Sequence, residues 1–143
     1  MMVNENGRLS FAERKCVEIF LHCHERVDLG AGGGLGRLID VVDRFGNHVD
    51  RFDMMCAAID SDIRSAEILD WIEKIESGEE TSVEGDGNGW VVFLNRKKVL
   101  FEGLYGQGEG GVVSFAQFQF AVRTFLLFLQ DSRSDPIKVA FLD

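Results

Sequence analysis

The sequence has few basic residues and almost no proline. Fifteen lysines and arginines stand against 24 aspartates and glutamates over 143 residues, which leaves a formal net charge of −9. Because binding to nucleic acids or anionic membranes requires clustered basic side chains, this balance argues against both kinds of partner. The single proline, the 12 phenylalanines and the 45% apolar content argue against disorder and supply material for one core. We therefore expect a single domain that spans residues 1–143.

Cysteine is also scarce, and the sequence shows no targeting signal. Cys16, Cys23 and Cys56 are three in number, so they cannot all pair within one chain. The first residues do not combine a basic segment with an apolar run, as a signal peptide would. The most apolar stretch, residues 110–129, is interrupted by polar side chains that a membrane span rarely tolerates. We expect a cytoplasmic protein with free thiols.

The N-terminal segment fits a helix, with a strand as the alternative for part of it. Ser10 and Glu13 have the spacing of a capping box, and residues 10–27 place their apolar side chains on one side at helical periodicity. Residues 16–24 also alternate between apolar and polar, as in a strand. The cap and the polar face favour the helix.

A seven-residue repeat of apolar side chains begins at Leu35. Positions 35, 42, 49, 56 and 63, and the positions three residues after each, are all apolar. This pattern is typical of helices that share one buried seam. Because Gly46 and residues 60–62 resemble helix ends, we expect two or three helices that finish at Gly78. The alternative is a long intermolecular coiled coil, in which the seam would form a homodimer.

The second half of the chain predicts a small antiparallel sheet and a buried helix. Residues 90–105 contain two β-rich runs that form a hairpin, with a further strand before them near residues 81–84, and residues 137–142 form a last strand. Residues 114–130 form a helix that opens with a capping box and carries five phenylalanines, so it is either a core helix or a homodimer interface. The predicted fold class is α+β, with N-terminal helices packed on this sheet.

The motifs that resemble catalytic or metal sites do not support an enzyme. Gly106-x-Gly108-x-x-Gly111 resembles a dinucleotide-binding loop, but too little chain follows it to build that fold. On a helix, His22 and His24 point to different sides and do not converge on a metal ion. We expect no catalytic residue, no cofactor and no metal. A nucleophile pair of Cys23 with a histidine is the remaining alternative for an enzyme.

The acidic residues gather just before the predicted hairpin. Residues 73–86 contain six acids and one lysine, which leaves a local charge of −5. A charge run of this kind is usually a solvated face. The functional interpretation is a landing surface for a basic partner, because complementary charge speeds association. Trp90 follows the cluster and is a candidate anchor, since aromatic residues are common at binding hot spots. The candidate contact residues are Glu73, Glu76, Glu79, Glu80, Glu84, Asp86 and Trp90.

The last 55 residues or so, with a hairpin, then the Phe-rich segment 111–129, then a final strand, resemble bacterial immunity proteins of contact-dependent inhibition and other polymorphic toxin systems. The resemblance implies a protein that binds its cognate toxin domain, often a basic nuclease, and occludes its active site by stoichiometric association. It transfers no binding residue to this chain. The alternative is a type III secretion chaperone, a small acidic dimer that masks an effector segment, with the element order α-β-β-β-α-β-β-α.

Overall fold

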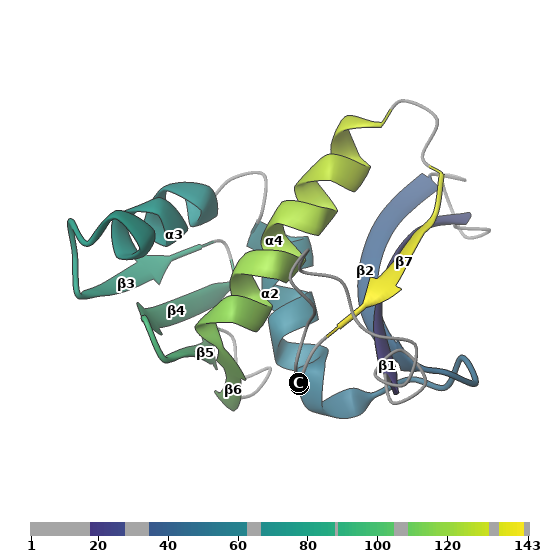
Figure 1. Ribbon diagram of the computed structural model, residues 1–143, viewed down its shortest axis with the longest axis horizontal. Coiled ribbons are helices and arrows are strands. Elements are labelled where there is room, and N and C mark those ends of the chain that lie inside the picture. Colours follow the sequence, from purple (N-terminus) through teal and green to yellow (C-terminus); the bar gives the residue numbers. More distant parts are fainter. Residues whose placement is uncertain are drawn as a thin grey trace, which may run out of the picture.

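The computed structural model describes residues 18–27, 35–62, 67–87, 89–104, 109–131 and 135–141 (Figure 1). Within these ranges two strands come first, two helices follow, and four strands precede the last helix and the last strand. The elements are β1 (Ile19–Val27), β2 (Leu35–Asp43), the 3-10 helix η1 (Asp50–Phe52), α2 (Asp53–Asp62), α3 (Ile68–Ser77), β3 (Ser82–Asp86), β4 (Trp90–Asn95), β5 (Lys98–Gly103), β6 (Glu109–Ser114), α4 (Phe115–Gln130) and β7 (Ile137–Ala140). The predicted α+β class is confirmed.

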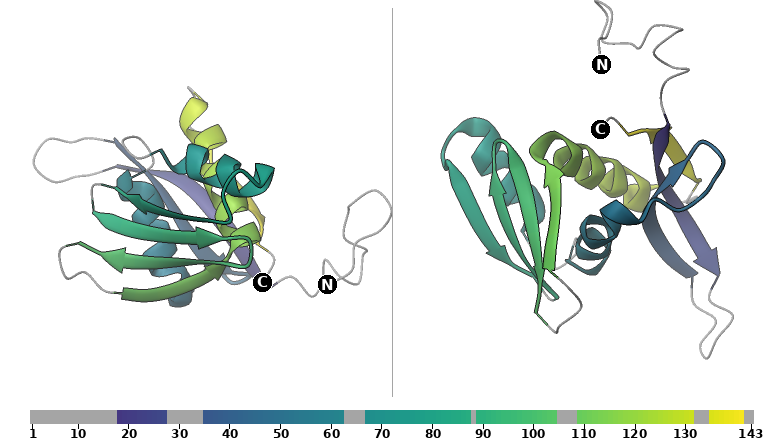
Figure 2. Two further views of the ribbon diagram at one scale, coloured as in Figure 1. Left: turned by 90° about the vertical axis from the view of Figure 1, so that its left-hand side faces the viewer. Right: turned by 90° about the horizontal axis from the view of Figure 1, so that it is seen from below.

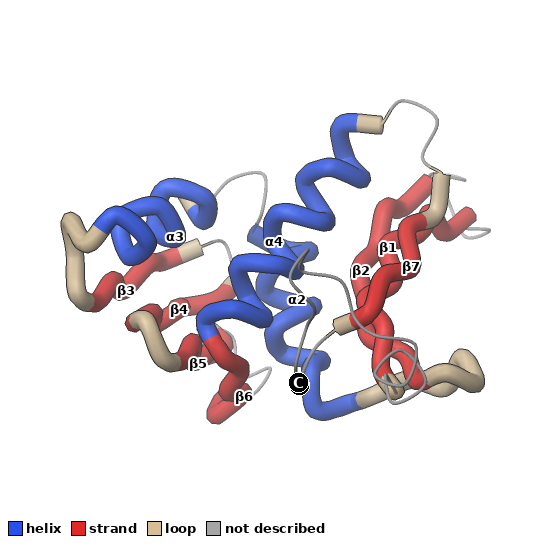
Figure 3. Tube along the Cα trace, in the orientation of Figure 1, coloured by secondary structure: helices blue, strands red, loops and turns tan. Residues whose placement is uncertain are grey.

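The described strands form two antiparallel sheets, of order β2-β1-β7 and β3-β4-β5-β6 (Figure 3). The predicted hairpin is confirmed as β4 and β5, whose connection is closed by the side-chain oxygen of Asn95, which accepts hydrogen bonds from the backbone of Lys97 and Lys98. The predicted last strand is confirmed as β7, but it pairs with β1 and not with the hairpin. The prediction of one small sheet was therefore wrong. Helix α4 lies between the two sheets (Figure 1). It follows β6 of the four-stranded sheet and precedes β7 of the three-stranded sheet, so the chain passes from one sheet to the other through α4.

The prediction of a helix over residues 10–27 was wrong for the part that the structure describes. Residues 19–27 form β1, with Leu21 and Cys23 fully buried on one face and Phe20, His22 and His24 on the other. The alternation already present in residues 16–24 was the correct signal, since a strand buries every second side chain. Ser10 and Cys16 lie outside the described residues, as do the glycines at positions 30–34 and 106–108.

The prediction of a continuous helical seam was wrong as well. Residues 35–43 form β2, which pairs with β1 over nine residues from Ile19 and Asp43 to Val27 and Leu35. Helix begins only at η1 and α2. Apolar residues fill so many positions between 35 and 42 that they satisfy the spacing of a helix and of a strand together. Without a continuous seam, the predicted homodimer through it loses its basis. Two of the predicted breaks are helix ends, because α2 ends at Asp62 and Gly78 follows α3 with φ +79°. Gly46 lies in a turn with φ +85°, but this turn follows the strand β2, so the predicted helix end there was wrong.

Helices α2 and α4 fill the space between the two sheets, and this layer holds the core (Figure 2). The predicted helix 114–130 is confirmed, and its capping box forms as expected, because Ser114 and Gln117 each accept a hydrogen bond from the other's backbone nitrogen. Four of its five phenylalanines are buried, and Phe118 meets Phe101 of β5 edge to face at 5.6 Å between ring centroids. The Phe-rich helix is therefore a core helix.

Candidate functional site

Helix α3 and strand β3 place the acidic residues at one edge of the four-stranded sheet. Helix α3 is strongly amphipathic and buries its apolar side, which consists of Ile68, Trp71, Ile72 and Ile75. The chain then turns at Gly78 and returns as β3, the outermost strand, which pairs only with β4 among the described strands. Residue Gly85 of β3 lies directly beneath the indole of Trp71, so helix and strand are in close contact.

All six predicted acidic contact residues are exposed. Glu73 and Glu76 lie on α3, Glu79 and Glu80 lie in the turn after it, and Glu84 and Asp86 lie on β3. The structure therefore brings the six carboxylates to one end of the molecule, and we call this set the acidic edge. Its members are Glu73, Glu76, Glu79, Glu80, Glu84 and Asp86.

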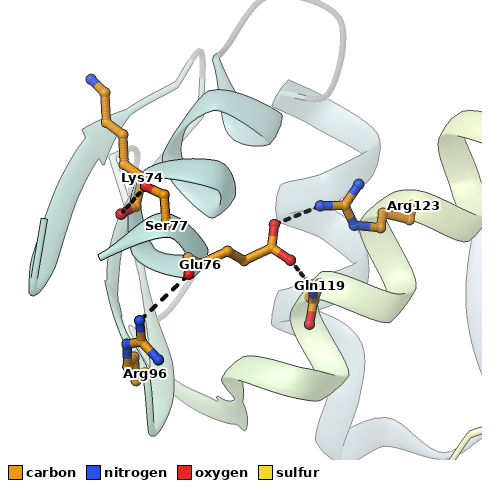
Figure 4. Close-up of polar contacts among 6 residues, drawn as sticks. All are labelled: Lys74, Glu76, Ser77, Arg96, Gln119 and Arg123. Carbon is orange, nitrogen blue, oxygen red and sulfur yellow. Dashed lines mark hydrogen bonds and ion pairs between the residues drawn. The ribbon is translucent and has the colours of Figure 1, made fainter. Parts of the chain in front are cut away.

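One member of the acidic edge already has partners within the chain. The Glu76 carboxylate receives hydrogen bonds from Arg123, at 2.5 Å, and from the side-chain amide of Gln119, both on α4 (Figure 4). Its backbone oxygen also accepts a hydrogen bond from Arg96 at 3.4 Å. Glu76 therefore holds α3 against α4, and it is not free to bind a partner as the sequence suggested.

The other five carboxylates form no hydrogen bond or ion pair with any residue that the structure describes. The one lysine among them, Lys74, is paired with Asp70 on the same helix at 3.2 Å, and this hydrogen bond raises the pKa of Lys74 above its usual value. The charge of the nearby Glu79 contributes to this rise as well, so Lys74 offsets part of the charge of the acidic edge. Within the described part of the chain the five carboxylates have no ion pair, and they are exposed to cations from outside.

An apolar surface that the sequence did not predict lies next to the acidic edge. The face of the four-stranded sheet that points away from the helices is uncovered by any described element (Figure 2). Its middle is formed by side chains that are only partly buried or exposed, and its border includes Glu84, Asp86 and Glu102. The apolar members are Val91, Phe93, Leu100 and Val112. The sequence signal was present in β4, where five consecutive apolar residues predict that both faces of the strand are shielded from water.

Trp90, the predicted anchor, does not lie on this surface. Its side chain is 4% exposed and belongs to the core, together with Val92 and Leu94 of the same strand. A side chain that is already buried in the free protein adds no new contact area on binding. The burial of Trp90 therefore gives no support to its predicted role as an anchor, and Phe93, on the open face of β4, is the aromatic residue partly exposed there.

No family, relative or solved structure supplies a template for these surfaces. Comparisons of the chain with protein-family models, with curated proteins and with solved structures give no match. The chemistry of the acidic edge therefore has to follow from its own residues. Among the helices in the described part of the chain, none combines the length and the apolar character needed to cross a bilayer.

A second group of polar side chains lies on the three-stranded sheet. His22 and His24 share one face of β1, and Asp40 of β2 is paired in register with His22. His22 Nδ1 lies 3.5 Å from Asp40 Oδ1, and His24 Nε2 lies 3.2 Å from Asp40 Oδ2. The sequence analysis had placed the two histidines on different sides of a helix. The strand brings them together, because residues two apart in a strand point the same way.

The described cysteines are buried and unsuited to nucleophilic catalysis. Burial, with a smaller effect of the nearby Asp40 carboxylate, raises the pKa of the Cys23 thiol to about 12. Burial also raises the pKa of Cys56 well above its ordinary value. Cys23 points into the core, while His22 and His24 lie on the opposite face of β1. The geometry therefore gives no support to a nucleophile pair of Cys23 with either neighbouring histidine.

We expect both buried thiols to resist modification in the folded protein. With an aromatic disulfide reagent at pH 8, Cys23 and Cys56 should react at least about 100-fold more slowly than after unfolding, because the thiolate is the reactive species. Peptide mass mapping of the labelled protein distinguishes them from Cys16. Fast labelling of Cys23 in the folded protein would show that its thiol is activated, and it would restore the enzyme hypothesis.

Proposed function

We propose that this chain is a binding protein of the immunity type, which neutralises a basic toxin domain by stoichiometric association through the acidic edge. The observation that carries this proposal is the set of five exposed carboxylates on α3, the following turn and β3, which have no hydrogen bond or ion pair to any described residue. They would face basic side chains around the toxin's active site. Because the binding uses preformed surfaces, it requires no cofactor.

The apolar face of the four-stranded sheet supports the same proposal. Stable protein interfaces combine an apolar centre with a polar rim. Here Phe93 and Leu100 lie near the middle of the open face, and Glu84 and Asp86 lie at its border on β3. In the proposed complex the carboxylates steer the toxin during encounter, and the apolar side chains are buried once it has docked.

A type III secretion chaperone is the alternative that the sequence leaves open. That class predicts the order α-β-β-β-α-β-β-α. In the described residues, α2 and α3 follow one another and four strands come between α3 and α4. The topology therefore does not favour this alternative, and the immunity-type role remains the proposal.

The proposal is tested by a protection assay. The C-terminal domain of a large secreted protein encoded beside this gene is expressed in a bacterial host with and without the chain. We expect the domain alone to stop growth, the chain to restore it, and the purified pair to migrate as a 1:1 complex. A toxin domain from an unrelated system serves as the control and should not be neutralised. If the adjacent domain is toxic and the chain neither binds it nor restores growth, the proposal is wrong.

A further inference from the structure

The histidines and the aspartate of the three-stranded sheet form a compact group that the proposed function does not use. Each of His22, His24 and Asp40 offers one ligand atom, and these atoms lie within 4.8 Å of one another. Within the described part of the chain, no other group of three such side chains comes close enough to share an ion. The acidic edge lies on the other sheet, so the two sites are independent (Figure 1).

The spacing of this group is that of a metal site. Four ligands placed tetrahedrally about 2.0–2.1 Å from a zinc ion lie about 3.3 Å from each other. The two measured distances from a histidine nitrogen to an Asp40 oxygen, 3.5 and 3.2 Å, are close to this value. The two imidazole rings are stacked, with their centroids 4.4 Å apart, and each has one nitrogen within 4.8 Å of the other ligand atoms.

The Asp40 carboxylate has unused capacity in this group. Its Oδ1 atom is buried and has no close hydrogen bond, since His22 Nδ1 lies 3.5 Å away, whereas Oδ2 is bonded to His24. A buried carboxylate oxygen without a close hydrogen bond is costly, because it has lost its water for little in return. A cation held between Asp40 and the histidines would satisfy it. An ion can reach the group from solvent, because the three side chains are between a quarter and a third exposed.

One positive side chain borders this group. Lys138 of β7 is paired in register with His22, and its ammonium group lies over the Phe20 ring on the same face of the sheet. Among the described side chains, it is a feature that repels a cation from the site.

We propose that His22, His24 and Asp40 bind one divalent transition-metal ion of the zinc class. Imidazole nitrogens and a carboxylate oxygen are ligands that Zn²⁺ accepts, and three protein ligands leave the fourth position to water. The ion joins β1 to β2 on the face that points away from the helices. It therefore stabilises the pairing of the first two strands.

Titration of the chelator-treated full-length protein with Zn²⁺ tests this proposal. All variants are made in a Cys16→Ser background, because Cys16 lies outside the described residues and its thiol is a competing ligand. We expect one Zn²⁺ per chain by calorimetry, and an affinity at least ~10-fold weaker in His24→Ala and in Asp40→Asn, since even residues that only support ligands contribute this much. The matched control is His48→Ala, because His48 is paired with Asp53 outside this group, and this variant should bind as tightly as the parent. Lys138→Gln should bind more tightly.

Co²⁺ provides a second readout that does not depend on how the variants fold. The visible bands of the cobalt protein should indicate nitrogen and oxygen ligands, without the near-ultraviolet band that cobalt–thiolate bonds give. Absence of saturable 1:1 binding in the parent protein overturns the proposal, and so does unchanged affinity in both His24→Ala and Asp40→Asn. Either result leaves the immunity-type function untouched, because the protection assay does not involve this face.

Discussion

Replacing Glu79, Glu80 and Glu84 with lysine is expected to slow association with the basic partner about 100-fold at low salt. Clustered charge raises association rates by 10- to 1,000-fold, and the three substitutions bring the formal charge of the six residues of the acidic edge from −6 to zero. A 100-fold loss corresponds to about 2.7 kcal/mol of binding free energy. Stopped-flow mixing with the toxin domain measures the rate, and surface plasmon resonance measures dissociation, which should change much less.

A matched variant separates the local field from the overall charge. Lysine at Glu18, Glu25 and Asp50 changes the net charge by the same amount, but Glu18 lies just before β1, Glu25 on β1 and Asp50 in η1. We expect this control to associate nearly as fast as the parent. Raising the salt concentration should slow the parent and leave the acidic-edge variant almost unaffected, because exposed charges are screened within about 10 Å at 0.1 M. Equal rates for both variants would remove the acidic edge from the mechanism.

The parts of the fold that the sequence predicted correctly are those whose signals are local. The hairpin of β4 and β5 and the helix α4 were predicted because turn residues and a capping box mark their ends. Ser114 and Gln117 form their reciprocal hydrogen bonds within one turn of helix, so no distant contact is needed to decide them. The ends of α2 and α3 were predicted for the same reason.

The parts that were wrong depend on contacts between distant residues. Residues 19–27 and 35–43 become strands because they pair with each other, and β1 pairs further with β7 at the other end of the chain. The seven-residue repeat contains no information on this pairing. The same error hid the group formed by His22, His24 and Asp40, because a helix separates two histidines that a strand places on one face. The helical periodicity assigned to residues 19–27 and 35–43 therefore made the fold prediction wrong and also separated the two histidines.

The acidic edge shows the opposite case, in which the residues were predicted but their roles were not. Composition alone located the six carboxylates, since charge runs are visible without any fold. It could not show that Glu76 bonds to Arg123, which is 47 positions away. Nor could it show that Trp90 faces the core, because the direction of a side chain in a strand depends on which face the helices cover.

The position of the acidic edge depends on one glycine. Gly85 lies within β3, where its missing side chain allows the Trp71 indole to lie against the strand. A Cβ atom built at Gly85 would lie 2.3 Å from Cζ2 of Trp71, and two further ring atoms would be within 2.5 Å. Trp71 is 8% exposed and rigid, so α3 would have to move away from the sheet.

We therefore expect Gly85→Ala to lower the free energy of unfolding by about 3 kcal/mol, at the upper end of what overpacking a core costs. Urea unfolding followed by tryptophan fluorescence measures the change. Ser82→Ala is the matched control, because Ser82 lies on the same strand with its side chain exposed, and it should change stability little.

A double-mutant cycle with Trp71→Ala shows whether the indole is the cause, because the cycle isolates the energy of one contact. Without the indole, adding the methyl group at Gly85 should cost much less. If Gly85→Ala is equally destabilising in both backgrounds, the contact between Trp71 and β3 is not what holds α3 in place.

If the contact does hold α3, Gly85→Ala should also weaken toxin binding, because Glu73 on the helix would move away from Glu84 and Asp86 on the strand. Stability and affinity would then fall together from one added methyl group outside the binding surface.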